Sequence, residues 1–97
     1  MDLLQTENFA GRVGEAFDLS LGEASTPLTL VQVQPLQPHV YPGMRRSPFS
    51  LIFRSSSSVV LPQKNYRLNN ATMGALDVFL VPVGREVGGV VYQAVFN

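Results

Sequence analysis

The stretch SPFSLIFRSSSSVVLPQKNYRL, from Ser47 to Leu68, decides the fold of this chain. It contains an alternating apolar segment, Phe49 to Arg54, and a second one, Asn65 to Asn69. Alternation with a period of two is typical of strands that bury one face, so we expect two β-strands here. Their inward-facing residues are predicted to be Phe49, Leu51, Phe53, Tyr66 and Leu68.

The run of four serines, Ser55 to Ser58, lies between these two segments. A polar loop between strands can hold a phosphate or a catalytic group, but no histidine stands near this run in the sequence. Short hydroxyl side chains also favour bends. We therefore interpret the run as a link between strands, which ends at Leu61-Pro62-Gln63, and not as a site.

The residues before this stretch predict a helical turn and two further strands. Thr6 to Gly11 has a plausible N-cap at Thr6 and a glycine that can stop a helix in a left-handed conformation, and Phe9 is expected to close one end of the core. Val13 to Leu21 alternates, with an inward face of Val13, Phe17, Leu19 and Leu21 on which Glu15 is the one exception.

Turn chemistry then separates this strand from the next. Gly22 to Pro27 is rich in turn-forming residues, and Leu28 to Gln34 is the next expected strand.

Two strands and a turn are expected in the last third of the chain. Ala75 to Val83 is apolar on both faces apart from Asp77, as in a central or fully covered strand, and Pro82 implies an open or bulged ladder. Gly84 to Gly89 is expected to reverse the chain, and Val90 to Phe96 to return.

The whole chain, residues 1–97, is therefore expected to form a single all-β domain. Six strands separated by turns, with no helix long enough for a crossover, favour a small antiparallel barrel or sandwich with a short N-terminal helical turn. The pattern leaves the choice between the two open. Five aromatic residues are predicted to face inward: Phe17, Phe49, Phe53, Phe79 and Phe96.

The sequence contains no recognisable catalytic signature. There is no cysteine, and His39 is the one histidine, so a thiolate or multi-histidine metal site is excluded and no cofactor is expected. Gly84 and Gly89 have the spacing of a phosphate loop, but valines stand where lysine and serine or threonine are needed. Glu15 and Asp77 are expected to form salt bridges with Arg54 or Arg67, with Asp77 on the solvent side.

The net charge is zero, but the charges are unevenly placed. Residues 1–23 contain five acidic residues and one basic residue, whereas residues 24–97 contain two acidic and six basic ones. The N-terminal segment is expected to lie against the basic strands, and the alternative is a dipolar particle that stacks head to tail. The bases are too scattered for nucleic acid, and the sequence contains neither a signal peptide nor a membrane-spanning apolar run, which favours a soluble cytoplasmic protein.

The proline-rich segment from Pro35 to Pro48 is the longest irregular piece of the chain, and long loops are often functional. It combines residue types that are enriched at protein interfaces. We expect the candidate interaction surface to consist of Tyr41, Met44, Arg45 and Arg46.

The order of segments resembles a family of bacterial proteins, the DUF6916 domain of unknown function. The resemblance runs from Phe9 to Asn97, and its most specific part is Phe79-Leu80-Val81-Pro82-Val83 followed by Tyr92-Gln93-Ala94-Val95-Phe96-Asn97. The family has no assigned catalytic residues, so the resemblance implies no chemistry. Members of the family also resemble companions of phage-tail-like, tail-collar proteins in bacterial genomes, which implies an assembly or accessory role.

These observations predict a non-catalytic interaction or structural module whose partner is a protein, either a second copy or another chain. The alternative is a small-ligand-binding barrel, which needs an internal cavity of at least about 300 Å³. An enzyme is the third hypothesis and requires a cleft that gathers His39 with a carboxylate or a serine.

Overall fold

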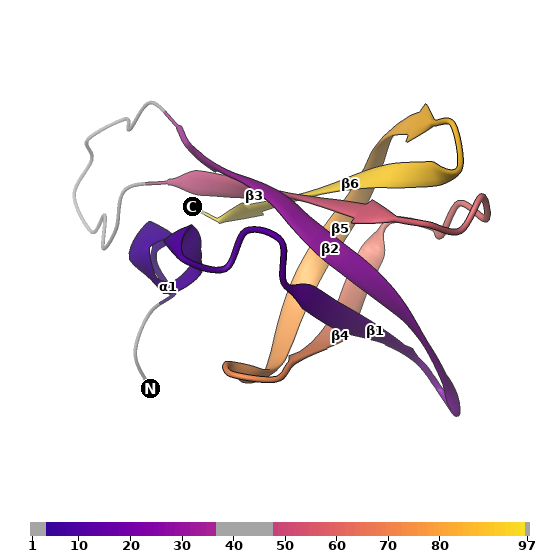
Figure 1. Ribbon diagram of the computed structural model, residues 1–97, viewed down its shortest axis with the longest axis horizontal. Coiled ribbons are helices and arrows are strands. Elements are labelled where there is room, and N and C mark those ends of the chain that lie inside the picture. Colours follow the sequence, from indigo (N-terminus) through magenta and orange to yellow (C-terminus); the bar gives the residue numbers. More distant parts are fainter. Residues whose placement is uncertain (1–3, 37–47, 97) are drawn as a thin grey trace.

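The computed structural model describes residues 4–36 and 48–96, which form a closed antiparallel β-barrel of six strands preceded by one helical turn (Figure 1). The predicted all-β fold class is confirmed, and of the two architectures that the sequence left open the chain adopts the barrel. The elements are α1 (Thr6–Ala10), β1 (Ala16–Leu21), β2 (Ala24–Pro35), β3 (Phe49–Ser55), β4 (Lys64–Asn70), β5 (Gly74–Glu86) and β6 (Gly89–Phe96).

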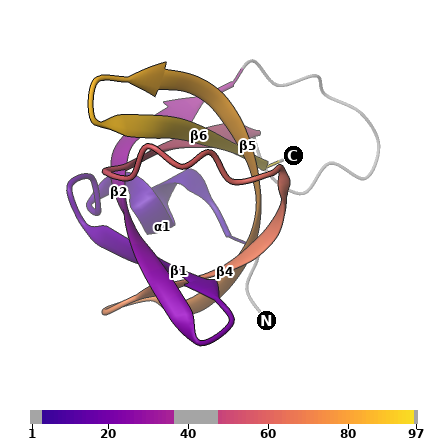
Figure 2. The ribbon, with the colours of Figure 1, turned by 90° about the vertical axis from the view of Figure 1, so that its right-hand side faces the viewer.

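The strands follow one another around the barrel in the order β1-β2-β3-β6-β5-β4, and β4 pairs with β1 to close it. The closing ladder is short, since it joins only Asp18 to Asn69 and Leu19 to Leu68. In this order β1 and β6 lie on opposite sides, as the view along the barrel shows (Figure 2). One side of the barrel therefore belongs to β3, β6 and β5, and the other to β1 and β4.

The strands on either side of the serine run fill the core as predicted. Phe49, Leu51 and Phe53 of β3 and Tyr66 and Leu68 of β4 are each at most 5% exposed. Each such side chain contributes about 1.5–3 kcal/mol to folding when it is buried. The alternation around the serines therefore identified both strands and the inward face of each.

The serine run is a bend, which confirms the interpretation from the sequence. The backbone N–H of Ser57 donates to the Ser55 hydroxyl at 3.0 Å, and that of Val59 donates to the Ser57 hydroxyl at 3.2 Å. Beyond the bend, the N–H of Leu61 donates to the hydroxyl of buried Tyr92 at 3.0 Å. Serine hydroxyls therefore hold this turn through local hydrogen bonds.

Helix α1 closes one end of the barrel through Phe9, as expected (Figure 1). Phe9 is fully buried, and its ring centroid lies 5.9 Å from those of Phe49 and Phe96 and 6.5 Å from that of Phe17. A five-residue helix is too short to be stable alone, so this packing holds it in place.

The predicted N-cap of this helix was wrong, whereas its predicted end at Gly11 is confirmed, although not in the predicted conformation. The N-cap is Gln5, one residue before Thr6, and its backbone N–H donates to the Asn8 side chain at 2.7 Å. Gly11 has φ −90° and is not left-handed. Gly14 instead has φ +95°, so the chain turns three residues later than expected.

This later turn also corrects the start of the first strand. β1 begins at Ala16, and its Phe17 and Leu19 are fully buried as predicted. Val13 and Leu21 are instead 52% and 41% exposed and do not face the core. The following turn is shorter than predicted, because only Gly22 and Glu23 connect β1 to β2 and Ala24 already pairs with Leu21. Ladder pairing with β1 therefore outweighs the turn preference of the Ser, Thr and Pro residues that follow.

The last two strands are longer than the sequence indicated. β5 continues to Glu86, so the reversal consists of Val87 and Gly88 and not of the whole segment from Gly84 to Gly89. The predicted irregularity near Pro82 is confirmed, since the register between β5 and β6 shifts between Pro82 and Gly84. The missing N–H of proline makes this a natural place for a bulge.

Candidate functional site

The surface that the sequence nominated, Tyr41, Met44, Arg45 and Arg46, lies outside the described residues, and so does His39. Among residues 4–36 and 48–96, no cluster of three or more histidine, cysteine or acidic residues is placed to hold a metal ion. In the same part of the chain, no helix has the length and apolar character needed to cross a membrane.

The interior of the barrel is filled by side chains. Phe17 and Phe53 meet edge to face with ring centroids 5.4 Å apart, and Phe49 stacks on Phe96 at 4.8 Å. The prediction that five aromatic residues face inward holds for Phe17, Phe49 and Phe53, while Phe96 is partly buried against the core. It is wrong for Phe79, which is 48% exposed because its neighbours Val78 and Leu80 face the core instead.

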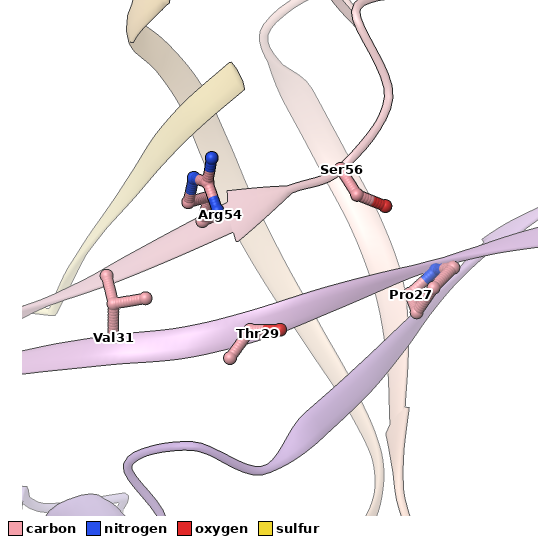
Figure 3. Close-up of a pocket in the computed structure, with 5 residues that line it drawn as sticks. All are labelled: Pro27, Thr29, Val31, Arg54 and Ser56. Carbon is pink, nitrogen blue, oxygen red and sulfur yellow. The ribbon is translucent and has the colours of Figure 1, made fainter. Parts of the chain in front are cut away.

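A hollow of about 170 Å³ lies on the outer face between β2 and β3 (Figure 3). Pro27, Thr29 and Val31 of β2 line it, together with Arg54 and Ser56. The Arg54 guanidinium is already engaged, because it lies 2.7 Å from a Glu86 carboxylate oxygen and donates to the Val87 carbonyl at 3.2 Å. It therefore offers no free cation for an anionic ligand.

A second hollow, of about 210 Å³, opens at the serine bend. Ser55, Ser57, Val59 and Leu61 line it from one side, and Leu21 and Thr26 from the β1–β2 hairpin. Drug-sized ligands usually occupy pockets of about 300–1,000 Å³. Both hollows are smaller than that and open to solvent.

The most distinctive surface lies on the outside of β3, β6 and β5. Ladder registers place alternate residues of these strands on one outer face. Phe79, Val83 and Val95 are 48%, 52% and 49% exposed, and their neighbours are half-buried. We call this surface the apolar wall: it consists of Ile52, Phe79, Val81, Val83, Val91 and Val95.

The opposite side of the barrel is polar at the corresponding positions. Asp18 and Ser20 of β1 and Arg67 and Asn69 of β4 face outward there, and the Asn69 amide donates to the Ser20 hydroxyl at 3.3 Å. The contrast between the two sides shows that the wall is not the ordinary outer surface of this barrel. Contiguous exposed apolar patches on soluble domains mark places of contact with other molecules.

An ion pair borders the wall at each end. Arg67 donates to both carboxylate oxygens of Asp77, at 3.1 and 3.3 Å, and Arg54 pairs with Glu86. The hydrogen bond with Arg67, and then its charge, lower the pKa of Asp77 below its ordinary value. The predicted solvent position of Asp77 and its pairing with a neighbouring strand are thus confirmed.

The predicted ion pairs of Glu15 are not found. Glu15 pairs with Arg12 at 3.5 Å and accepts a hydrogen bond from Asn70 at 3.1 Å, instead of reaching Arg54 or Arg67. The ion pairs found among the described residues join acid to base within the N-terminal segment or within the later strands. Within residues 4–36 and 48–96, direct ion pairs therefore do not provide the expected cancellation between the two parts of the chain.

The sequence contains a signal for the apolar wall in the strand that became β5. Ala75 to Val83 is apolar on both faces apart from Asp77, and this pattern predicts a strand that is covered on both sides. One face of β5 does contact the core, but the outer face is exposed within the described structure. The sequence signal for the apolar wall is thus a strand that is apolar on both faces, when a single barrel can bury only one of them.

The fold and the wall together define a small closed β-barrel with a filled interior and one apolar outer side. The family model described as domain of unknown function DUF6916 matches residues 4–96, and the chain belongs to this family. No curated protein and no solved structure matches the chain.

Proposed function

We propose that this chain is a non-catalytic interaction module that buries its apolar wall against a protein partner. The observation that carries the proposal is the set of apolar side chains exposed on β3, β6 and β5 of a barrel whose own core is complete. Burying them would contribute about 25 cal/mol for each Å² of apolar surface removed from water.

The residue types of the wall suit a protein partner. Phenylalanine is enriched at interfaces and charged residues are depleted at their centres, and the wall contains one exposed aromatic ring and no charge. The resemblance of family members to companions of phage-tail-like proteins supports a role in a protein assembly. We propose that the chain serves as an accessory protein in a phage-tail-like or similar protein assembly.

A small-ligand-binding barrel is the alternative, and the hollow at the serine bend is the feature that favours it. That hollow is apolar on one side through Leu21, Val59 and Leu61. Its volume of about 210 Å³ suits a single side chain better than a separate ligand. The wall, by contrast, offers an extended face, so a protein contact is the better supported proposal.

Site-specific photo-crosslinking tests the proposal. A photoreactive amino acid at position 79 should form protein adducts in lysate of the source organism, whereas the same group at position 18, on the polar side, should not. Val95→Ser in the position 79 protein should reduce the adducts, because it removes an apolar side chain from the same face.

Equal adducts from positions 79 and 18 would contradict the proposal, and so would an absence of adducts at position 79. Circular dichroism of each variant serves as the folding control. Loss of adducts without loss of strand signal assigns the effect to the surface.

A further inference from the structure

Gln93 occupies the centre of the apolar wall. It lies on β6 and faces outward, between Val81 of β5 and Ile52 of β3 in the paired registers. Val91 and Val95 lie two positions before and after it on the same strand and the same face. No hydrogen bond joins its side chain to any other residue within 4–36 and 48–96.

Apolar residues therefore flank Gln93 both along its own strand and on the two neighbouring strands. Along β6 the outward order is Val91, Gln93, Val95, and across the strands it is Val81, Gln93, Ile52. An interface between two identical surfaces related by a two-fold axis requires a surface that is complementary to itself. A carboxamide meets this requirement, because it has both a hydrogen-bond donor and an acceptor and can pair with its own copy.

The charges near the wall also suit a second copy. Each border holds both signs, Arg67 with Asp77 at one end and Arg54 with Glu86 at the other. A second copy therefore brings both signs of charge to each border, where an acid of one copy can lie near a base of the other. The net charge of the chain is zero, so no overall repulsion opposes the approach.

We propose that the partner of the wall is a second copy of this chain, in a two-fold dimer whose axis passes beside Gln93. This inference rests on the proposed function and names its partner. In the dimer the two Gln93 carboxamides hydrogen-bond to each other at the centre of an apolar interface. A partner with no hydrogen-bonding group opposite Gln93 would leave its carboxamide buried and unpaired, which is costly.

Gln93→Glu is the sharpest test, because it keeps the shape of the side chain and places two like charges opposite each other. Sedimentation equilibrium of the full chain from about 1 µM to about 1 mM should show a dimer for the unchanged protein. At pH 7 the dissociation constant of the variant dimer should be at least about tenfold higher than that of the unchanged protein. Gln63→Glu, an exposed position outside the wall, is the matched control and should leave the dimer unchanged.

The pH dependence of the variant provides a second readout. Two facing carboxylates in an apolar contact raise each other's pKa, so the Gln93→Glu variant should regain its dimer as the pH falls below about 5. Protonated carboxyl groups can pair as the amides do. A dimer that persists in Gln93→Glu at pH 7 would overturn the proposed axis.

A chain that stays monomeric over the whole range would overturn the dimer. It would leave the proposed function standing if position 79 still forms adducts with a different protein. The absence of both the dimer and the adducts would overturn both proposals.

Discussion

At the scale of single residues, the burial of a side chain depends less on its type than on the strand face from which it projects. Phe79 and Phe53 are both aromatic residues within strands, yet Phe53 is fully buried and Phe79 is 48% exposed. Asp77 stands on the same outer face as Phe79, and its pairing with Arg67 satisfies both charges in place. The border of the wall is thus defined by an ion pair within one copy of the chain.

Titration of Asp77 is the measurable consequence of that pair. Its pKa in the folded chain is lowered by the hydrogen bond and charge of Arg67, so the pair stabilises the fold above the unfolded pKa and ceases to do so as the pH falls through the folded pKa. Carbon-detected NMR should find the Asp77 carboxyl titrating below an ordinary aspartate, and Arg67→Gln should raise its midpoint. Lys64→Gln, three residues away on β4, should leave it nearly unchanged; an equal rise in both variants would contradict the assignment.

At the scale of elements, the β5–β6 hairpin shows where backbone contact limits the sequence. Gly89 begins β6 so close to the end of β3 that an added Cβ would collide with the backbone carbonyl oxygen of Ser55. Gly84, in the bulge of β5, has open space around the same position and no positive φ. The two glycines therefore look alike in sequence but differ in what the fold demands of them.

Alanine at each glycine separates these roles. Gly89→Ala should lower the free energy of unfolding by about 1–3 kcal/mol, because a collision with backbone cannot be relieved by a rotamer change. Gly84→Ala should leave it unchanged or raise it slightly, because alanine restricts the unfolded chain without a clash. Urea unfolding followed by circular dichroism measures both, and equal losses in the two variants would contradict the close approach of β3 and β6.

At the scale of the whole molecule, the core and the apolar wall use opposite faces of one strand, β5. Leu80 points into the barrel and is fully buried, whereas its neighbour Phe79 points out from the wall. The core cluster around Leu80 also includes residues of α1, β1, β2, β3, β4 and β6. The outer face contributes little to that cluster and is free to serve contact with another molecule.

Substitutions at these two neighbours should therefore have opposite effects. Leu80→Ala should cost about 2–5 kcal/mol of folding stability through the cavity it leaves. Phe79→Ser should change stability by less than about 1 kcal/mol yet weaken self-association. Thermal unfolding at low protein concentration and sedimentation at high concentration separate the two; a large stability loss in Phe79→Ser would show that the residue serves the core.

Local sequence patterns correctly predicted the all-β class, the number of strands, the inward faces of β3 and β4, the closing of one end by Phe9 and the irregularity at Pro82. These follow from local rules, because strict alternation marks a buried face and proline removes a ladder donor. Only the tertiary structure decided that β1 meets β4 to close a barrel, because such pairing joins residues about fifty positions apart. It also decided which face of β5 looks outward, since a strand that is apolar on both faces has no alternation to reveal its phase. The apolar wall arises from that undetermined phase, and for this reason the sequence pointed to the proline-rich loop instead.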